Sequence, residues 1–302
     1  MTQTKSAAQT EHLATSSPGN SSQDNPLQDI ALQANALSNQ SPSGDSANES
    51  ATRPAAATLQ CAVVVGVGAS QGIGAAVCRR IAQEGLLVYV AGRSVEKLDK
   101  VVAEIRQQGG AAERYVLDAS KTAEVDALFR QIAKRQQVLA LVVHNVGSNM
   151  PSRFLSSSLH FFDRMWRLTF LSAYLVGQRA SSLMLKQQHG TLIFTGASAS
   201  LRGKPYFAAF TIGKSALRAY AQGLAKILHT ENIHVAHVVI DGVVDGDRVN
   251  KALYGLGNWF RRLWGKGGLS IESIADNYWM LHQQAKPVWI HELDLRPLGE
   301  RF

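Results

Sequence analysis

The 302-residue chain has a formal net charge of +8, and 45% of its residues are hydrophobic. No apolar run is long enough to span a bilayer, and the basic residues are scattered without a recognition motif, which argues against nucleic-acid binding. The start of the chain lacks the apolar core of a signal peptide, so we expect a cytoplasmic protein.

Residues 1–58 differ in composition from the rest of the chain, because they are rich in Ser, Gln, Asn and Ala and contain no aromatic residue. Such a segment cannot bury enough apolar surface to offset the entropy lost on ordering, so we expect a disordered tail. It holds two basic and five acidic residues, a net charge of −3, which leaves +11 for residues 59–302. That charge favours an anionic ligand such as a phosphorylated cofactor.

From residue 59 onward, apolar runs alternate with amphipathic segments, and this order predicts a single domain over residues 59–302. The runs are nearly continuous in Val, Ile, Leu and Ala, as expected for parallel strands that are covered on both faces. Their alternation with helices predicts a Rossmann-type α/β fold, a doubly wound parallel β-sheet flanked by helices, with its ligand crevice at the carboxyl ends of the strands. The expected strands are Cys61–Val67, Leu86–Ala91, Glu113–Leu117, Val138–His144, Gly190–Thr195, His234–Ile240 and Val288–Leu293, and the expected helices are Val95–Gln108, Thr122–Arg135, Ser158–Lys186 and Phe207–His229.

A glycine-rich turn follows the first expected strand and leads into a helix. Glycines remove the Cβ atoms that would hold a diphosphate away from the backbone, and the start of a helix offers N–H groups and a partial positive charge. A strand, a glycine turn and a helix in this order indicate a dinucleotide site, although a tight turn without a ligand has the same spacing. We expect the diphosphate to be bound by Gly68, Ser70, Gln71, Gly72, Ile73 and Gly74.

Three further strands end in residues that suit a dinucleotide. Arg93 follows the second strand, where no acid is present, and because a guanidinium suits a 2′-phosphate, NADP(H) is favoured over NAD(H). Asp118 follows the third strand, placed either to accept a hydrogen bond from the adenine amino group or only to begin the next turn. Asn145 and Gly147 follow the fourth strand, where we expect them to border the two riboses.

Four motifs in this order resemble those of the short-chain dehydrogenase/reductase family, and the resemblance runs from Gln60 to the end of the chain. They are Gly68-x-x-x-Gly72-Ile73-Gly74, His144-Asn145-Val146-Gly147, the strand Leu192-Ile-Phe-Thr-Gly-Ala-Ser198, and Lys214, 16 residues after Ser198. The resemblance implies that Ser198 holds the substrate oxygen and that Lys214 binds the nicotinamide ribose. The alternatives are a strand-end turn for Ser198 and a solvated helix lysine for Lys214. The resemblance also implies a homodimer or homotetramer.

The expected active site departs from the family at two positions. Phe210 stands where the family's catalytic tyrosine precedes the lysine by four residues, and Thr169 replaces the asparagine of the central helix. A phenyl ring cannot transfer a proton, so the acid–base step, worth roughly 10²–10⁴ in rate, needs another donor. Tyr206 is the favoured substitute, with packing of a loop aromatic as its alternative. The other candidates are Tyr174, Tyr220, Ser148, Asn149 and Ser200.

The C-terminal third contains the last expected contacts. Asp241 replaces the proline of the family's Pro-Gly motif, and the backbone of Val243 is placed to contact the nicotinamide amide. Residues 245–269 are rich in Trp, Arg and Gly and are expected to form a substrate lid, with an interaction patch or incidental packing as alternatives. The ending from Tyr278 onward resembles that of a bacterial subgroup of the family that also has Phe in place of the catalytic tyrosine.

These residues together predict an NAD(P)-dependent oxidoreductase of the short-chain type, with a small-molecule carbonyl or alcohol substrate and an atypical proton donor. The alternatives are a non-catalytic NADP(H)-binding protein that acts as a sensor or oligomer partner, and after it a lyase or isomerase. Neither Cys61 nor Cys78 is expected to bind a metal or form a disulfide, because both lie in apolar positions.

Overall fold

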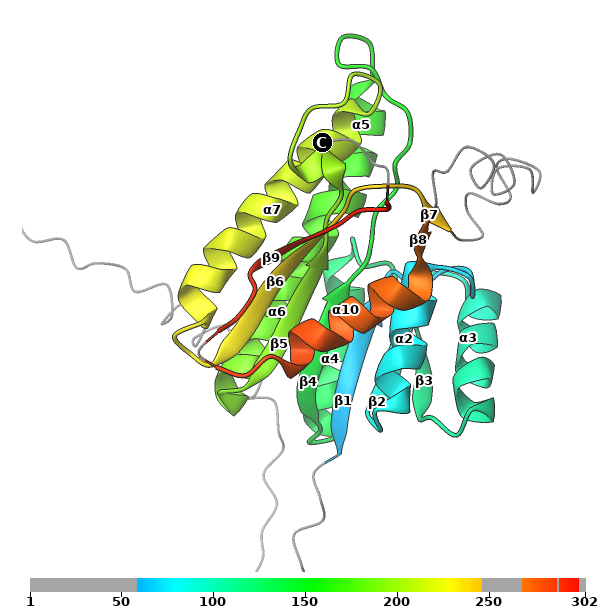
Figure 1. The fold of residues 1–302 in the computed structure, drawn as a ribbon, viewed down its shortest axis with the longest axis vertical. Helices are drawn as coiled ribbons and strands as arrows, with labels where there is room; N and C mark the ends of the chain where they lie inside the picture. Colours follow the sequence, from blue (N-terminus) through cyan, green and yellow to red (C-terminus); the bar gives the residue numbers. More distant parts are fainter. Residues whose placement is uncertain (1–58, 246–267, 287, 299–302) are drawn as a thin grey trace, which may run out of the picture. The chain divides into compact units, whose positions relative to one another are not determined.

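A computed structural model describes residues 59–245, 268–286 and 288–298. Seven parallel strands form its main sheet, in the order β3-β2-β1-β4-β5-β6-β9 (Figure 1). Every residue of β2, β5 and β6 is buried, which explains why these segments are continuous apolar runs. The strands are β1 (Gln60–Val65), β2 (Leu87–Gly92), β3 (Ala112–Val116), β4 (Val138–His144), β5 (Gly190–Thr195), β6 (Ile233–Ile240) and β9 (Glu292–Leu295).

Helices cover both faces of the sheet, and each face has its own hydrophobic core. On one face α2, α3 and α10 share a core with the even-numbered residues of β1 and β2, and on the other α4, α6 and α7 share a core with the odd-numbered ones. Helix α7 lies beside β6 (Figure 1). Two cores separated by a parallel sheet are the arrangement expected of a doubly wound fold. The helices are α2 (Ile73–Gln83), α3 (Val95–Gln107), α4 (Thr122–Lys134), α5 (Leu159–Trp166), α6 (Ser172–Gln187), α7 (Ala208–Leu228) and α10 (Ile271–Gln283).

The described structure confirms the predicted Rossmann-type fold and refines several boundaries. The first strand ends two residues early, because Gly66 turns the chain with a φ of +95°. The long central helix is divided by a π-helical turn, Arg167–Leu171. Helix α10 was not anticipated, and neither was the short parallel pair β7 (Val244–Asp245) and β8 (Leu269–Ser270).

Two of the sequence predictions concern segments that lie largely outside the described residues. The predicted tail, residues 1–58, lies outside the described residues, and so do residues 246–267 of the predicted lid. Within the described ranges, no helix combines the length and the apolarity that crossing a bilayer requires. Both cysteines are buried and free, as predicted.

Candidate cofactor and active site

The glycine turn between β1 and α2 packs closely against the end of β4. A Cβ on Gly66 would lie 2.7 Å from the backbone of Asn145, and one on Gly74 would lie 3.0 Å from Asn145 Nδ2. Asn145 is itself fixed, because its N–H donates to Val65 O at 2.8 Å. These two glycines therefore let the turn approach the β4 end, which is where the sequence predicted the cofactor.

Gly68 has a different surrounding, because no described atom would lie within 4 Å of a Cβ at this position. Its backbone therefore faces open space beside the start of α2. A diphosphate needs such an uncovered backbone next to a helix N-terminus. The turn thus fits the cofactor that the sequence predicted.

The Ser70 side chain holds the glycine turn to α3. Its hydroxyl donates to the carboxylate of Glu104 at 2.6 and 2.7 Å, and Arg79 joins this carboxylate at 3.0 Å. Gln71 is exposed beside the turn, whereas Ile73 packs against the core. Of these three predicted contacts, Ser70 therefore has structural partners already, because Arg79 also donates to its carbonyl at 3.1 and 3.2 Å, and its backbone N–H is the group left to meet a phosphate.

Arg93 and Asp118 come together at the carboxyl ends of β2 and β3. Arg93 is exposed. Burial alone would raise the pKa of the Asp118 carboxyl, but hydrogen bonds from Ser120 N and Oγ and the charges of Arg93 and Lys121 bring this pKa below its ordinary value. Asp118 therefore stays ionised and stabilises its own turn. The exposed Arg93 guanidinium next to it can bind a second anion.

Lys214 is the most unusual residue of the site, because its side chain is only 3% exposed. Its Nζ donates to Thr195 O at 2.6 Å and to Val146 O at 3.3 Å, so it joins the ends of β5 and β4. A Cβ on Gly147 would lie 3.3 Å from this nitrogen. Loss of hydration lowers the pKa of Lys214 to about 7. The structure thus brings Asn145, Gly147 and Lys214 to one edge of the sheet.

Phe210 lies one helical turn before Lys214, and the Lys214 Nζ is 5.9 Å from the centre of its ring. Thr169 is buried and donates to Met165 O at 2.6 Å, within the π-helical turn. Its side chain fills the space next to Gly213 on α7. Neither residue carries a free acid–base group, in agreement with the sequence prediction.

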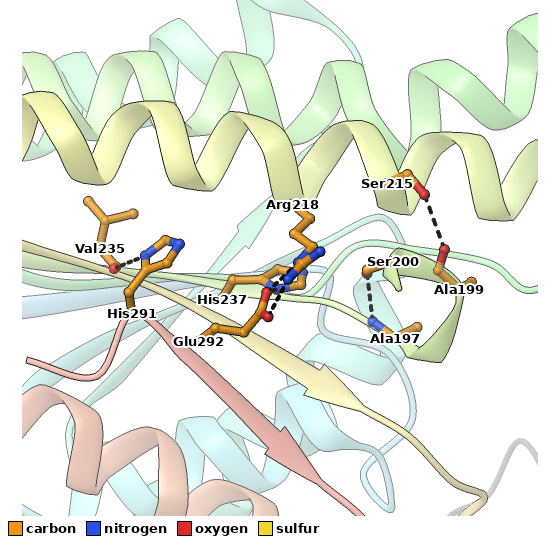
Figure 2. A network of polar contacts seen from close by, with 9 residues as sticks. All are labelled: Ala197, Ala199, Ser200, Ser215, Arg218, Val235, His237, His291 and Glu292. Carbon is orange, nitrogen blue, oxygen red and sulfur yellow. Dashed lines mark hydrogen bonds and ion pairs between the residues drawn. The ribbon is translucent and has the colours of Figure 1, made fainter. Parts of the chain in front are cut away.

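Ser198 begins the 3₁₀ turn Ser198–Ser200 that follows β5. Its side chain is half-buried, and its hydroxyl has no hydrogen-bond partner in the described ranges. The Ser200 hydroxyl accepts from Ala197 N at 3.1 Å (Figure 2), and Ser200 is only 5% exposed. Of the two serines, Ser198 is therefore the more accessible to a substrate.

The three tyrosine candidates have different surroundings. Tyr206 is 67% exposed and lies in a loop just before α7. Tyr220 donates to Tyr174 O at 3.2 Å inside an aromatic cluster between α6 and α7, and burial raises the Tyr220 pKa. Tyr220 and Tyr174 therefore pack helices together, and Tyr206 alone among the three has an exposed hydroxyl group near the start of α7.

At the end of β6, Asp241 takes the place where the family motif has proline. Its carboxylate is 2% exposed and pairs with Arg202 at 2.8 Å and with Arg296 at 3.1 Å. Two guanidinium groups offset the cost of burying this charge. Val243 follows in the short strand region, where its carbonyl accepts from Leu269 N at 2.9 Å.

A buried polar network, which the sequence did not reveal, lies under α7. His237 on β6 contacts Glu292 on β9 through Nδ1 at 3.0 Å, and Arg218 donates to the same carboxylate at 2.6 and 2.7 Å (Figure 2). Burial lowers the pKa of His237 to about 4, so the ring is neutral at pH 7. Because the carboxylate can only accept, the ring proton lies on Nδ1, and Nε2 has no partner among the described residues.

The His237 ring occupies the place of a Cβ on Gly196, the residue that follows β5. The network therefore lies directly beneath the turn that carries Ser198. Two histidines, His234 and His237, inside an otherwise apolar strand were the available signal in the sequence. The partners of His237 could not be identified, because Arg218 and Glu292 are 74 residues apart.

Comparisons with known proteins agree with this geometry. The family model described as short chain dehydrogenase matches residues 61–253. A 3-oxoacyl-[acyl-carrier-protein] reductase of Synechocystis sp. is 30% identical over 193 residues, 64% of this chain and 77% of that protein. A fatty acyl-CoA reductase of Acinetobacter baylyi is 28% identical over 173 residues, which are 57% of this chain and only 59% of the reductase.

A solved structure gives the same result for the fold. The short-chain dehydrogenase from Rhodopseudomonas palustris superimposes with a TM-score of 0.67 at 33% identity, over 79% of this chain and 99% of that one. The family match, the related sequences and the parallel sheet with its glycine turn all lead to one assignment. The chain belongs to the short-chain dehydrogenase family.

Proposed function

We propose that the protein is an oxidoreductase that transfers hydride between NADP(H) and a carbonyl or alcohol substrate. The observation that carries this proposal is the position of Lys214, buried against the ends of β4 and β5 with Gly147 beside its Nζ. A lysine at that place would bind the nicotinamide ribose, as the family resemblance implies. The bound cofactor supplies the hydride.

The residues that would hold the cofactor follow the edge of the sheet. The uncovered backbone around Gly68 suits the diphosphate, and Arg93 suits a 2′-phosphate because its exposed guanidinium can form two charge-assisted hydrogen bonds. Asp118 would meet the adenine, whereas Asn145, Gly147 and Val243 would border the riboses and the nicotinamide. We therefore propose a preference for NADP(H) over NAD(H).

The proton donor that best suits this site is Lys214 itself. With a pKa of about 7, the side chain is partly protonated at neutral pH and can give or take a proton. In the direction of reduction, the Lys214 ammonium would give its proton to the carbonyl oxygen as the cofactor supplies hydride to the carbonyl carbon. The alcohol leaves, and the neutral amine takes a proton from water. Ser198 would hold the substrate oxygen with its free hydroxyl.

Tyr206 is the second candidate for the donor, because its hydroxyl is exposed next to the start of α7. The variants Lys214→Arg and Tyr206→Phe separate the two. If Lys214 is the acid, the wild-type reduction rate falls above pH 7. Lys214→Arg then loses most of the rate and no longer shows this fall, whereas Tyr206→Phe keeps the wild-type pH profile. The reverse result would assign the proton to Tyr206.

The proposal is tested by titrating the purified protein with NADPH and with NADH in a calorimeter, and then by following nicotinamide absorbance with a panel of carbonyl compounds. Tight binding of NADPH and its oxidation by at least one compound class support the function. If neither NADPH nor NADH gives a heat of binding, the proposal is overturned. Arg93→Asp should remove the preference for NADPH, and an unchanged preference would exclude Arg93 from the 2′-phosphate site.

Phe210 favours a second function, that of an NADP(H)-binding protein without turnover. Tight NADPH binding without oxidation by any carbonyl compound would support it. The variant Phe210→Tyr then restores a hydroxyl one turn before Lys214. A large gain in rate would identify a dormant dehydrogenase site, and no gain would favour the sensor or oligomer partner. The dimer or tetramer and the subgroup with Phe at this position remain predictions from the family resemblance.

A further inference from the structure

A cavity of about 490 Å³ lies next to the start of α7 and is lined almost entirely by polar residues. Four of its six lining residues carry a hydroxyl group, one is an arginine, and one is a proline. They are Pro151, Ser152, Arg153, Ser156, Ser157 and Tyr206. A cavity with this lining is built for a ligand that accepts hydrogen bonds.

Hydrogen bonds connect the lining of the cavity to the start of α7, the helix that carries Lys214. Ser152 N donates to Tyr206 O at 2.8 Å, Ala208 N donates to Ser152 O at 3.1 Å, and Ser152 Oγ accepts from Ala209 N at 3.1 Å. Ala208 begins α7, and Lys214 lies six positions further along the helix, a rise of about 9 Å along the axis. A substrate whose carbonyl lies at Lys214 can therefore reach the cavity with a chain of several carbon atoms.

The stretch of sequence that supplies the lining of the cavity is strongly basic. Asp163 is the only acidic residue between Asp126 and Glu231, a stretch that holds thirteen lysines and arginines. Asp163 is paired with Arg167 at 2.8 Å. Arg153 and Lys204, by contrast, have no ion-pair partner in the described part of the chain. Arg153 is exposed and lines the cavity together with four hydroxyl-bearing residues, and a guanidinium without a counter-charge can form strong hydrogen bonds to an anion.

The hydroxyl groups of the cavity are available to a ligand. Ser152 Oγ accepts from the start of α7, so its own O–H is left to donate. Ser156, Ser157 and Tyr206 have no side-chain hydrogen bond in the described ranges, and Tyr206 is 67% exposed.

We propose that this cavity binds the anionic group of the carbonyl substrate, either a carboxylate or a phosphate ester at the far end of its chain. The inference rests on the proposed function, because it names the class of substrate for the same site. Arg153 binds the anion, the hydroxyl groups of Ser152, Ser156 and Tyr206 complete its hydrogen bonds, and the carbonyl reaches Lys214.

The test compares substrates that differ only in charge. One pair is 7-oxooctanoate and its methyl ester, and the other is 7-hydroxyheptan-2-one and its phosphate monoester. We expect wild-type kcat/KM to be higher for the anion of at least one pair, and the pair with the larger ratio distinguishes a carboxylate from a phosphate. In Arg153→Gln this ratio should fall about ten-fold, the loss expected for one charged hydrogen-bonding partner at about 1.4 kcal/mol per factor of ten.

Arg164→Gln is the matched control, since Arg164 is an exposed arginine of the neighbouring helix α5 and does not line the cavity. It should leave the ratio unchanged. Equal kcat/KM for anions and neutral partners in the wild type, or an equal loss for both in Arg153→Gln, would overturn the inference.

Failure of the proposed function gives a different result. If no compound is reduced, the NADPH-loaded wild type and both variants are titrated calorimetrically with 7-oxooctanoate and with the phosphate monoester. Binding that weakens about ten-fold in Arg153→Gln alone supports the anion site although turnover is absent. No binding to the wild type, or equal binding to all three proteins, overturns it.

Discussion

Because Lys214 is buried, the free energy of unfolding of the protein without cofactor should depend on pH. One substitution at this residue should remove the dependence. The pKa of this side chain is 10.5 when exposed and about 7 in the folded protein, because burial removes its hydration. Between these two values the unfolded chain holds a proton that the folded protein has lost. The free energy of unfolding therefore rises with pH in this range, by about 1.4 kcal/mol per pH unit once the folded amine is neutral.

In the variant Lys214→Met this dependence disappears. From pH 7 to pH 9 the wild type should gain about 2 kcal/mol of unfolding free energy relative to the variant, since the folded amine is already half neutral at pH 7. Urea unfolding at pH 7, 8 and 9 measures the difference, and contributions from histidines and cysteines cancel because both proteins contain them. Lys226→Met, an exposed lysine of the same helix, is the control. If the difference between wild type and Lys214→Met is constant over this range, Lys214 is not a titrating buried amine and its role as proton donor loses its basis.

Three further substitutions test the packing around the site. Gly196→Ala places a methyl group on the His237 ring and should cost about 1–3 kcal/mol, whereas Gly203→Ala, with no described atom within 4 Å of its Cβ, should stay within about 0.5 kcal/mol in the same urea experiment. Glu292→Gln should lower the unfolding free energy by about 1–3 kcal/mol at pH 7, because Arg218 and His237 lose their carboxylate. The hydrogen bonds from Arg218 lower the pKa of Glu292, so this stabilisation is present above its ordinary pKa of 4.5 and is lost as the pH falls through the lowered value. A difference that persists in strong acid would refute the ionic role. Ser152→Ala should cost about 1 kcal/mol in thermal or urea unfolding through the lost bond to Ala209 N, and Ser156→Ala should be neutral. Equal effects of these two would show that Ser152 does not stabilise the start of α7.

Local patterns in the sequence were sufficient for most of the fold. Apolar runs marked five of the seven strands of the main sheet, because parallel strands covered on both faces need apolar side chains throughout. The other two, β3 and β9, carry charged and partly exposed side chains, and β9 begins four residues after the predicted Val288. The glycine turn, the strand ends and Lys214 could also be located, since parallel strands bring their carboxyl ends to one edge. Helix α10 was missed because the run from Tyr278 to His282 was interpreted as part of a C-terminal family motif instead of a buried helix face.

The properties that depend on neighbours far along the chain could be determined only from the folded structure. Spacing placed Lys214 next to the expected cofactor, but its pKa follows from burial against Val146 and Thr195, which belong to two other strands. The link between His237 and Glu292 joins residues 55 positions apart, and the anion cavity is formed where the loop of Arg153 meets Tyr206. A local sequence pattern reports the period and polarity of its own segment. The desolvation of a charge and the lining of a cavity depend on which segments the fold brings together, and so they were decided by the packing.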